Sequence, residues 1–189
     1  MSKSDFDQFV KRQQAEQQEA TATFEPQQQL DEWLSYLNAL YRDITRYLEG
    51  YIHAGEAQID YRDVTLNEDF IGAYVAREMI LKIGPSTVTF TPIATMLIGM
   101  KGRVEVQGAT GRASLILVNK LATSARSLIQ IQVRVIRPGA SPLPLPKPSP
   151  DEMTKIQWVW KIAAPPPQMK FIELTQNTFY DMILEVANG

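Results

Sequence analysis

Apolar residues recur at helical spacing near the start of the chain. Between Leu30 and Tyr51 they fall at i, i+3, i+4 and i+7, which is typical of one face of an amphipathic helix. Pro26 suits the first turn of a helix, and Gly55 suits the left-handed position that closes one. The pattern therefore predicts a long helix over residues 27–54.

Downstream of this helix the apolar residues alternate with polar ones, which is typical of strands with one buried face. Short alternating segments, separated by turns that contain Gly or Pro, predict antiparallel hairpins between residues 58 and 174. The strands are expected at residues 58–64, 74–83, 87–91, 104–107, 113–118, 129–135 and 156–162. Turns are expected at residues 98–103 and 108–111. The continuous apolar run at residues 113–118 predicts burial on both faces of its strand.

A shorter helix is predicted at the end of the chain, over residues 175–187. Apolar residues there follow the same helical spacing, and Thr175 is a suitable N-cap. The residues that form this second stripe are Phe179, Met182, Ile183 and Val186. The helical and alternating segments together predict an α+β fold: a twisted antiparallel meander of about six to eight strands with both helices on its apolar face. A half-open barrel is the alternative form of the sheet.

Two segments fall outside these periodic patterns. Residues 1–26 are rich in Gln and poor in large apolar residues, so we expect a flexible N-terminal arm. Residues 138–150 alternate Pro with other residues, which predicts an extended loop because proline cannot join a strand ladder. Residues 27–189 are accordingly expected to form a single domain.

Composition narrows the functional classes. The 189 residues include no cysteine, which excludes disulfides, zinc–thiolate sites and thiol catalysis. The formal net charge is -2, so we expect neither nucleic-acid binding nor membrane-surface binding. The first residues lack the apolar core of a signal peptide, and no segment is apolar for long enough to span a bilayer. These features predict a soluble, cytoplasmic protein of bacterial type.

Candidate catalytic groups are few. The single histidine, His53, falls at the end of the predicted long helix, where the helix dipole favours a cation. Asp60, Asp63 and Glu68 match no calcium loop or nuclease spacing, although a metal-dependent enzyme that uses them is one hypothesis. Residues 99–102 resemble a phosphate-clamping GxxG loop, but their neighbours alternate as strands do, which favours a hairpin turn. We therefore predict no enzyme activity, no metal and no cofactor.

Aromatic and basic side chains supply the candidate interaction surface. Aromatic residues on the long helix are typical anchors of protein interfaces, and arginines on the polar face of the sheet can engage an acidic partner. The candidates are Trp33, Tyr36, Tyr41, Tyr47, Arg103, Arg112 and Arg134. The leading hypothesis is a non-enzymatic protein–protein interaction module, such as an adaptor, a regulatory subunit or an immunity-like subunit. Its partner is another protein or a second copy of itself in a homodimer.

A carrier for a small apolar ligand is the alternative hypothesis. A curved sheet that is closed by a long helix can enclose an apolar pocket between the two. The side chains expected to line such a pocket are Met79, Phe90, Met96, Met100 and Trp160. Trp160 and its strand neighbour Trp158 also fit simple core packing, which is the interpretation we favour for both.

Overall fold

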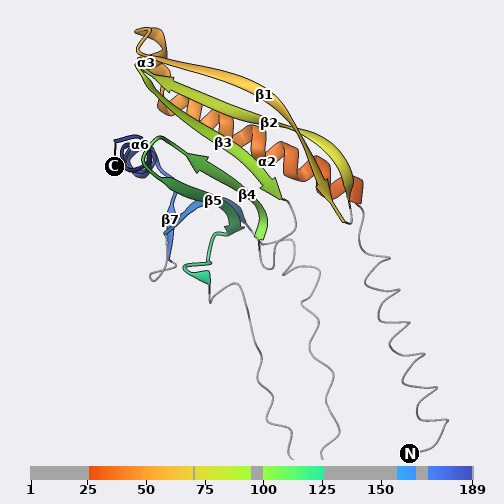
Figure 1. The fold of residues 1–189 in the computed structure, drawn as a ribbon. Helices are drawn as coiled ribbons and strands as arrows, with labels where there is room; N and C mark the ends of the chain where they lie inside the picture. The colour runs from red at the N-terminus through yellow and green to blue at the C-terminus, as the bar shows by residue number, and fades with distance from the viewer. Residues whose placement is uncertain (1–25, 70, 95–99, 126–156, 165–169, 189) are drawn as a thin grey trace, which may run out of the picture.

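The computed structural model describes residues 26–69, 71–94, 100–125, 157–164 and 170–188 (Figure 1). The helices are α2 (Pro26–Tyr47), α3 (Glu49–His53) and α6 (Gln176–Asn188). The strands are β1 (Ala57–Glu68), β2 (Gly72–Ile83), β3 (Ser86–Ala94), β4 (Met100–Gln107), β5 (Arg112–Asn119), β6 (Trp158–Ala163) and β7 (Phe171–Glu173). The predicted α+β fold is confirmed.

The described strands form one open antiparallel sheet in chain order, from β1 at one edge to β7 at the other. The first hairpin is the longest, because β1 and β2 pair continuously from Ala57 opposite Ile83 to Glu68 opposite Gly72. Both strands are longer than the alternating pattern predicts. The strand expected at residues 129–135, the loop at 138–150 and the arm at 1–25 lie outside the described residues.

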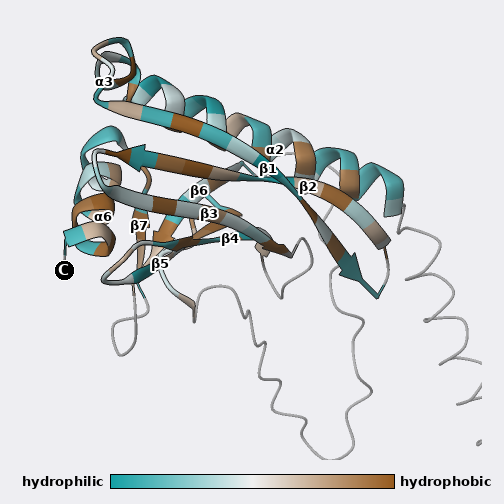
Figure 2. Cartoon of the chain, turned by 45° about the horizontal axis from the view of Figure 1, so that its top comes forward, coloured by the Kyte–Doolittle hydropathy of each residue, from teal (hydrophilic) through white to brown (hydrophobic). Residues whose placement is uncertain are grey.

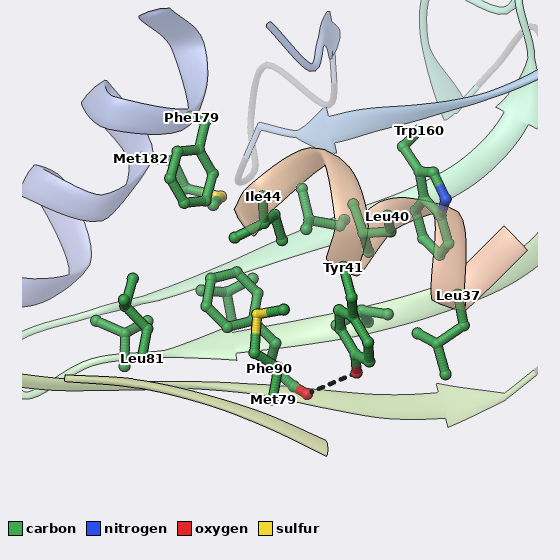
Figure 3. Close-up of a cluster of buried hydrophobic side chains, with 14 of the residues drawn as sticks. Leu37, Leu40, Tyr41, Ile44, Met79, Leu81, Phe90, Trp160, Phe179 and Met182 are labelled. Carbon is green, nitrogen blue, oxygen red and sulfur yellow. Dashed lines mark hydrogen bonds between the residues drawn. The ribbon is translucent and has the colours of Figure 1, made fainter. Parts of the chain in front are cut away.

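Helix α2 crosses one face of the sheet and buries its apolar stripe there (Figures 1 and 2). Leu37, Leu40 and Ile44 are at most 2% exposed, and they pack with residues of β2 to β6 in the main core (Figure 3). The predicted single helix over residues 27–54 is wrong in one respect, because it breaks at Leu48. The backbone there leaves the helical region, and α3 continues for five residues before Gly55 closes it at a φ of 73°.

Helix α6 is held at both of its ends. At the N-terminus Thr175 is the N-cap, as predicted: the Thr178 amide donates to Thr175 Oγ1, and the Thr175 amide donates to Thr178 Oγ1. At the C-terminus the turn between β4 and β5 supplies donors, since the Thr110 and Gly111 amides both donate to the Val186 carbonyl oxygen. These bonds seat the helix on the sheet beside β3 and β5.

The two predicted turns have different outcomes. Residues 108–111 form the expected tight turn, with the Gly108 amide donating to the Gly111 carbonyl oxygen. The turn expected at residues 98–103 is wrong for residues 100–103, because Met100–Gln107 is strand β4, and residues 98 and 99 lie outside the described residues. A register shift between Met100 and Gly102 interrupts that pairing with β5. Gly102 marks close packing there, since a Cβ at this position would lie 2.0 Å from an atom of the Trp33 ring.

The face of the sheet opposite α2 is called the outer face here. Successive strand residues point to opposite faces, so Phe90, Val104 and Leu115 face the main core while their neighbours face outward. The outer face carries a second, smaller apolar cluster near β5, where Ile116 and Val118 pack with Ala122. The prediction of burial on both faces is therefore confirmed for residues 115–118, whereas Ala113 and Ser114 are only half-buried. Within the described residues, no helix combines the length and apolar composition needed to cross a bilayer.

Candidate functional site

A hollow of about 530 Å³ opens on the outer face of the sheet, over β4 to β7 and the end of α6. We call it the outer-face pocket. Its size lies in the range of ordinary ligand sites, roughly 300–1,000 Å³. The side chains on which its chemistry depends are Met100, Arg103, Glu105, Arg112, Ser114, Ile116 and Phe171.

Arg103 is the charged group held most firmly in this pocket. It is half-buried on β4, and its Nη2 donates to Ser114 Oγ on β5 at 3.1 Å. Its Nε is buried and has no hydrogen-bond partner. Among the described residues, no ion pair joins a carboxylate to its guanidinium. A buried charged donor without an acceptor is costly, so this atom favours an anionic ligand that supplies one.

The second arginine of the pocket is held loosely. Arg112 Nη1 lies 3.7 Å from Glu105 Oε1, and the two side chains are 69% and 29% exposed. An ion pair this long and this exposed contributes little to stability, so both groups can change partners at small cost. Glu185 of α6 also lines the pocket and balances the lining charges. The positive charge available to a ligand therefore lies mainly at Arg103.

Apolar side chains form the wall beside Arg103. Ile116 packs in the second cluster with Met100, Ala163 and Phe171. The chain after β5 lies against this cluster, because the Phe171 amide donates to the Thr123 carbonyl oxygen. A ligand that fits the pocket therefore combines an anionic group with apolar groups.

Lys161 on β6 holds the segment that follows β5 next to this apolar wall. The lysine is 7% exposed, and its Nζ donates to the carbonyl oxygens of Lys120 and Ala122, both at 2.7 Å. These bonds tie the segment after β5 to β6. Because both bonds are internal, Lys161 shapes the pocket and is not a free cation for a ligand.

The other buried charge of the outer face is already satisfied. Glu78 on β2 is 3% exposed and accepts from Arg62 Nη2 at 2.5 Å and from Thr91 Oγ1 at 2.6 Å. A carboxylate with two such partners is a structural group. We therefore do not count Glu78 among the candidate ligand-binding or catalytic groups.

The predicted site residues separate into two groups. Trp33 and Tyr41 are 1% and 3% exposed in the main core, so the prediction that they offer surface contacts is wrong. Tyr36 and Tyr47 are half-buried against that core, and their carbonyl oxygens accept from Trp160 and Tyr180. The aromatic stripe of α2 thus packs on its own sheet.

The arginines of the prediction fare differently. Arg103 and Arg112 lie together in the outer-face pocket. Arg134 lies outside the described residues. An interaction role for all three stays a prediction. The sequence did not indicate Ser114 or Phe171, and it assigned Met100 to a different pocket, because strand pairing and not sequence spacing brings these residues beside Arg103.

The side chains proposed to line a carrier pocket are also dispersed. Met79 and Phe90 are fully buried, and Trp160 packs with them in the main core, as expected for core packing (Figure 3). Met100 lines the outer-face pocket instead. Met96 lies outside the described residues. The described members of this set therefore do not share one cavity between α2 and the sheet.

The described part of the chain holds no group of three or more histidine, aspartate or glutamate side chains suited to a metal ion. Asp60 accepts from Lys82 Nζ at 2.8 Å and from Gln58 Nε2 at 2.9 Å, and these bonds hold its pKa below the usual range. Glu68 accepts from the Tyr74 hydroxyl. His53 ends α3, where the sequence places it. The chain matches no protein-family model, no curated protein and no solved structure.

Proposed function

We propose that the chain is a non-catalytic binding module whose outer-face pocket takes a segment of another protein that carries a carboxylate beside apolar side chains. The observation that carries the proposal is Arg103, which lines an open pocket and has a buried Nε without an acceptor among the described residues. An incoming carboxylate would accept from this Nε and from the Ser114 hydroxyl. Hydrogen bonds from arginine to a carboxylate are charge-assisted and roughly twice as strong as those between neutral groups.

The apolar wall supports a peptide segment over a bare anion. Met100, Ile116 and Phe171 provide apolar area next to the guanidinium. Apolar burial supplies affinity, while the charged pair supplies specificity. The proposal includes an adaptor or regulatory role in the cytoplasm, with which the absence of cysteine is compatible.

The test is a panel of short fluorescein-labelled peptides in which one glutamate is flanked by leucine or phenylalanine. Each peptide is paired with one that carries glutamine in place of the glutamate. We expect glutamate peptides to bind about tenfold or more tightly than their glutamine partners, because a charge-assisted hydrogen bond contributes about 1.5–3 kcal/mol. Fluorescence polarisation measures both affinities.

Arg103→Gln should remove this preference and leave the melting temperature nearly unchanged. The matched control is Arg46→Gln, because Arg46 is an exposed arginine of α2 that pairs with Asp43 and lies outside the pocket. The control variant should bind as the unmodified protein does. Equal binding of glutamate and glutamine peptides, or an Arg103→Gln variant that keeps the preference, would contradict the proposal.

A further inference from the structure

Among the described strands, β1 is an edge strand, because β2 pairs with one of its sides and no described strand pairs with the other. It spans twelve residues, Ala57–Glu68, and pairs only with β2 among the described strands. No backbone hydrogen bond within the described residues reaches it from its outer side. Figure 1 shows β1 along the margin of the molecule. A long open edge is a template for another strand unless charge or shape prevents the pairing.

The side chains at the middle of β1 carry opposite charges two residues apart on one face. Asp60 is held by Lys82 and Gln58, and Arg62 is held by Glu78. The Asp60 and Arg62 side chains remain 39% and 65% exposed. Each side chain is therefore held in position by its own sheet and is still exposed enough to contact a second strand.

Symmetry restricts how two copies of β1 can pair. A two-fold axis perpendicular to the sheet keeps each face on its own side, so one residue of β1 must lie opposite its own copy. If that residue is Asp60, Arg62 or Asp63, two like charges meet at the axis. If it is Tyr61, Asp60 of each copy lies opposite Arg62 of the other, twice. Opposite charges directly across a strand pair are favourable.

We propose that β1 pairs antiparallel with β1 of a second copy, centred on Tyr61, to give a homodimer with one continuous sheet. Tyr61 is 44% exposed at this edge. Residues 57–65 of the two copies would then be opposite one another. Charges of alternating sign would then cross the junction. In order they are Glu78 and Arg62 of one copy, followed by Asp60 and Lys82 of the second copy. This inference is independent of the outer-face pocket.

The expected dimer is reversible. A single strand pair buries less area than the roughly 1,200 Å² at the lower end of standard-size interfaces. Light scattering across a range of concentrations should therefore show a mass that rises from monomer to dimer. A monomer at every concentration would overturn the proposal, and would show that the charges on β1 protect the edge.

The absence of cysteine makes the register directly measurable. Tyr61→Cys places two thiols at the axis, where paired Cα atoms lie about 4.5–5.5 Å apart, within disulfide reach. Mild oxidation should give a covalent dimer on a non-reducing gel. The matched control is Thr65→Cys on the same strand. Its two copies would lie eight residues apart, roughly 26 Å, and should stay monomeric on the gel.

A charge reversal tests the same register without relying on the cysteine variants. Asp60→Arg places arginine opposite arginine twice, so the dimer should weaken by about tenfold or more. Asp69→Arg makes the same charge change outside the paired segment and should dimerise as the unmodified chain does. Equal cross-linking of both cysteine variants, or equal dimerisation of both arginine variants, would overturn the proposed register.

Discussion

Most of the buried polar groups discussed above have hydrogen-bond partners within the protein. The Tyr41 hydroxyl, Glu78 and Lys161 are buried, and each has two partners. Two described side chains differ, because Trp33 Nε1 in the main core and Arg103 Nε beside the pocket are buried without an acceptor, and of these only the arginine is charged. Buried polar groups are nearly always paired in folded proteins, so an unpaired charged donor beside a pocket indicates binding more strongly than the paired groups do.

Tyr41→Phe should destabilise the fold, although the ring keeps its packing. The hydroxyl donates to the Arg77 carbonyl oxygen at 2.6 Å. It also lies 3.3 Å from the Phe90 carbonyl oxygen (Figure 3). Its loss leaves these oxygens without that donor and should cost about 1–3 kcal/mol in the free energy of unfolding. Urea denaturation measures the change. Tyr36→Phe is the control and should stay within about 0.5 kcal/mol.

Stability should fall in the alkaline range because of two tyrosines. Burial raises the pKa of Tyr41, and burial with the hydrogen bond to Glu68 raises the pKa of Tyr74. A raised folded-state pKa gives stability that is full below the unfolded value of about 10 and is lost as the pH rises above it. Urea midpoints at several pH values test this prediction. Tyr41→Phe should flatten the decline, and an unchanged decline would contradict the assignment to Tyr41.

Helices in this fold are positioned by close approaches that only glycine permits. A Cβ on Gly102 would overlap the buried Trp33 ring, and a Cβ on Gly108 would lie 2.2 Å from the Val186 carbonyl oxygen. The first contact sets α2 on β4, and the second sets α6 on the turn between β4 and β5. Strands β4 and β5 carry the pocket residues Arg103 and Ser114 on their outer face. The packing of α2 and α6 therefore helps to position these two side chains.

Gly102→Ala should therefore destabilise the protein by about 1–3 kcal/mol, because overpacking displaces Trp33 from its site. Gly50→Ala is the matched control, since nothing lies within 4 Å of the position that its Cβ would take in α3. That change should be neutral or stabilise by up to about 1 kcal/mol. Thermal and urea unfolding compare the two variants. A Gly102→Ala protein as stable as the Gly50→Ala protein would contradict the packing described here.

The elements themselves could be predicted from periodicity because each buries one face. Alternation located β1 to β6, and the helical stripes located α2 and α6. The break at Leu48 and the strand character of Met100–Arg103 could not be predicted, since both depend on contacts between distant segments. Gly-rich sequence indicates a turn and a close packing site equally well, and Gly102 is the second kind.

The whole molecule has one face of the sheet filled by helices and another that stays partly open. The aromatic stripe of α2 was predicted both as core and as interface, and burial decides for the core at Trp33 and Tyr41. Two arginines of the site could be predicted from alternation alone. The apolar wall could not, because Met100, Ile116 and Phe171 come from three strands that are brought together by pairing and by the segment that Lys161 anchors.

The measurement that tests the binding site most directly is a two-dimensional ¹H–¹⁵N spectrum that resolves the Arg103 Nε–H signal. The protein is titrated with the tightest glutamate peptide of the panel and then with its glutamine partner. Binding at the outer-face pocket predicts that the glutamate peptide shifts this signal and the Ser114 amide, and protects the Nε–H from exchange. A peptide that binds while the Arg103 signal stays unmoved, with shifts confined to α2 residues, would contradict it.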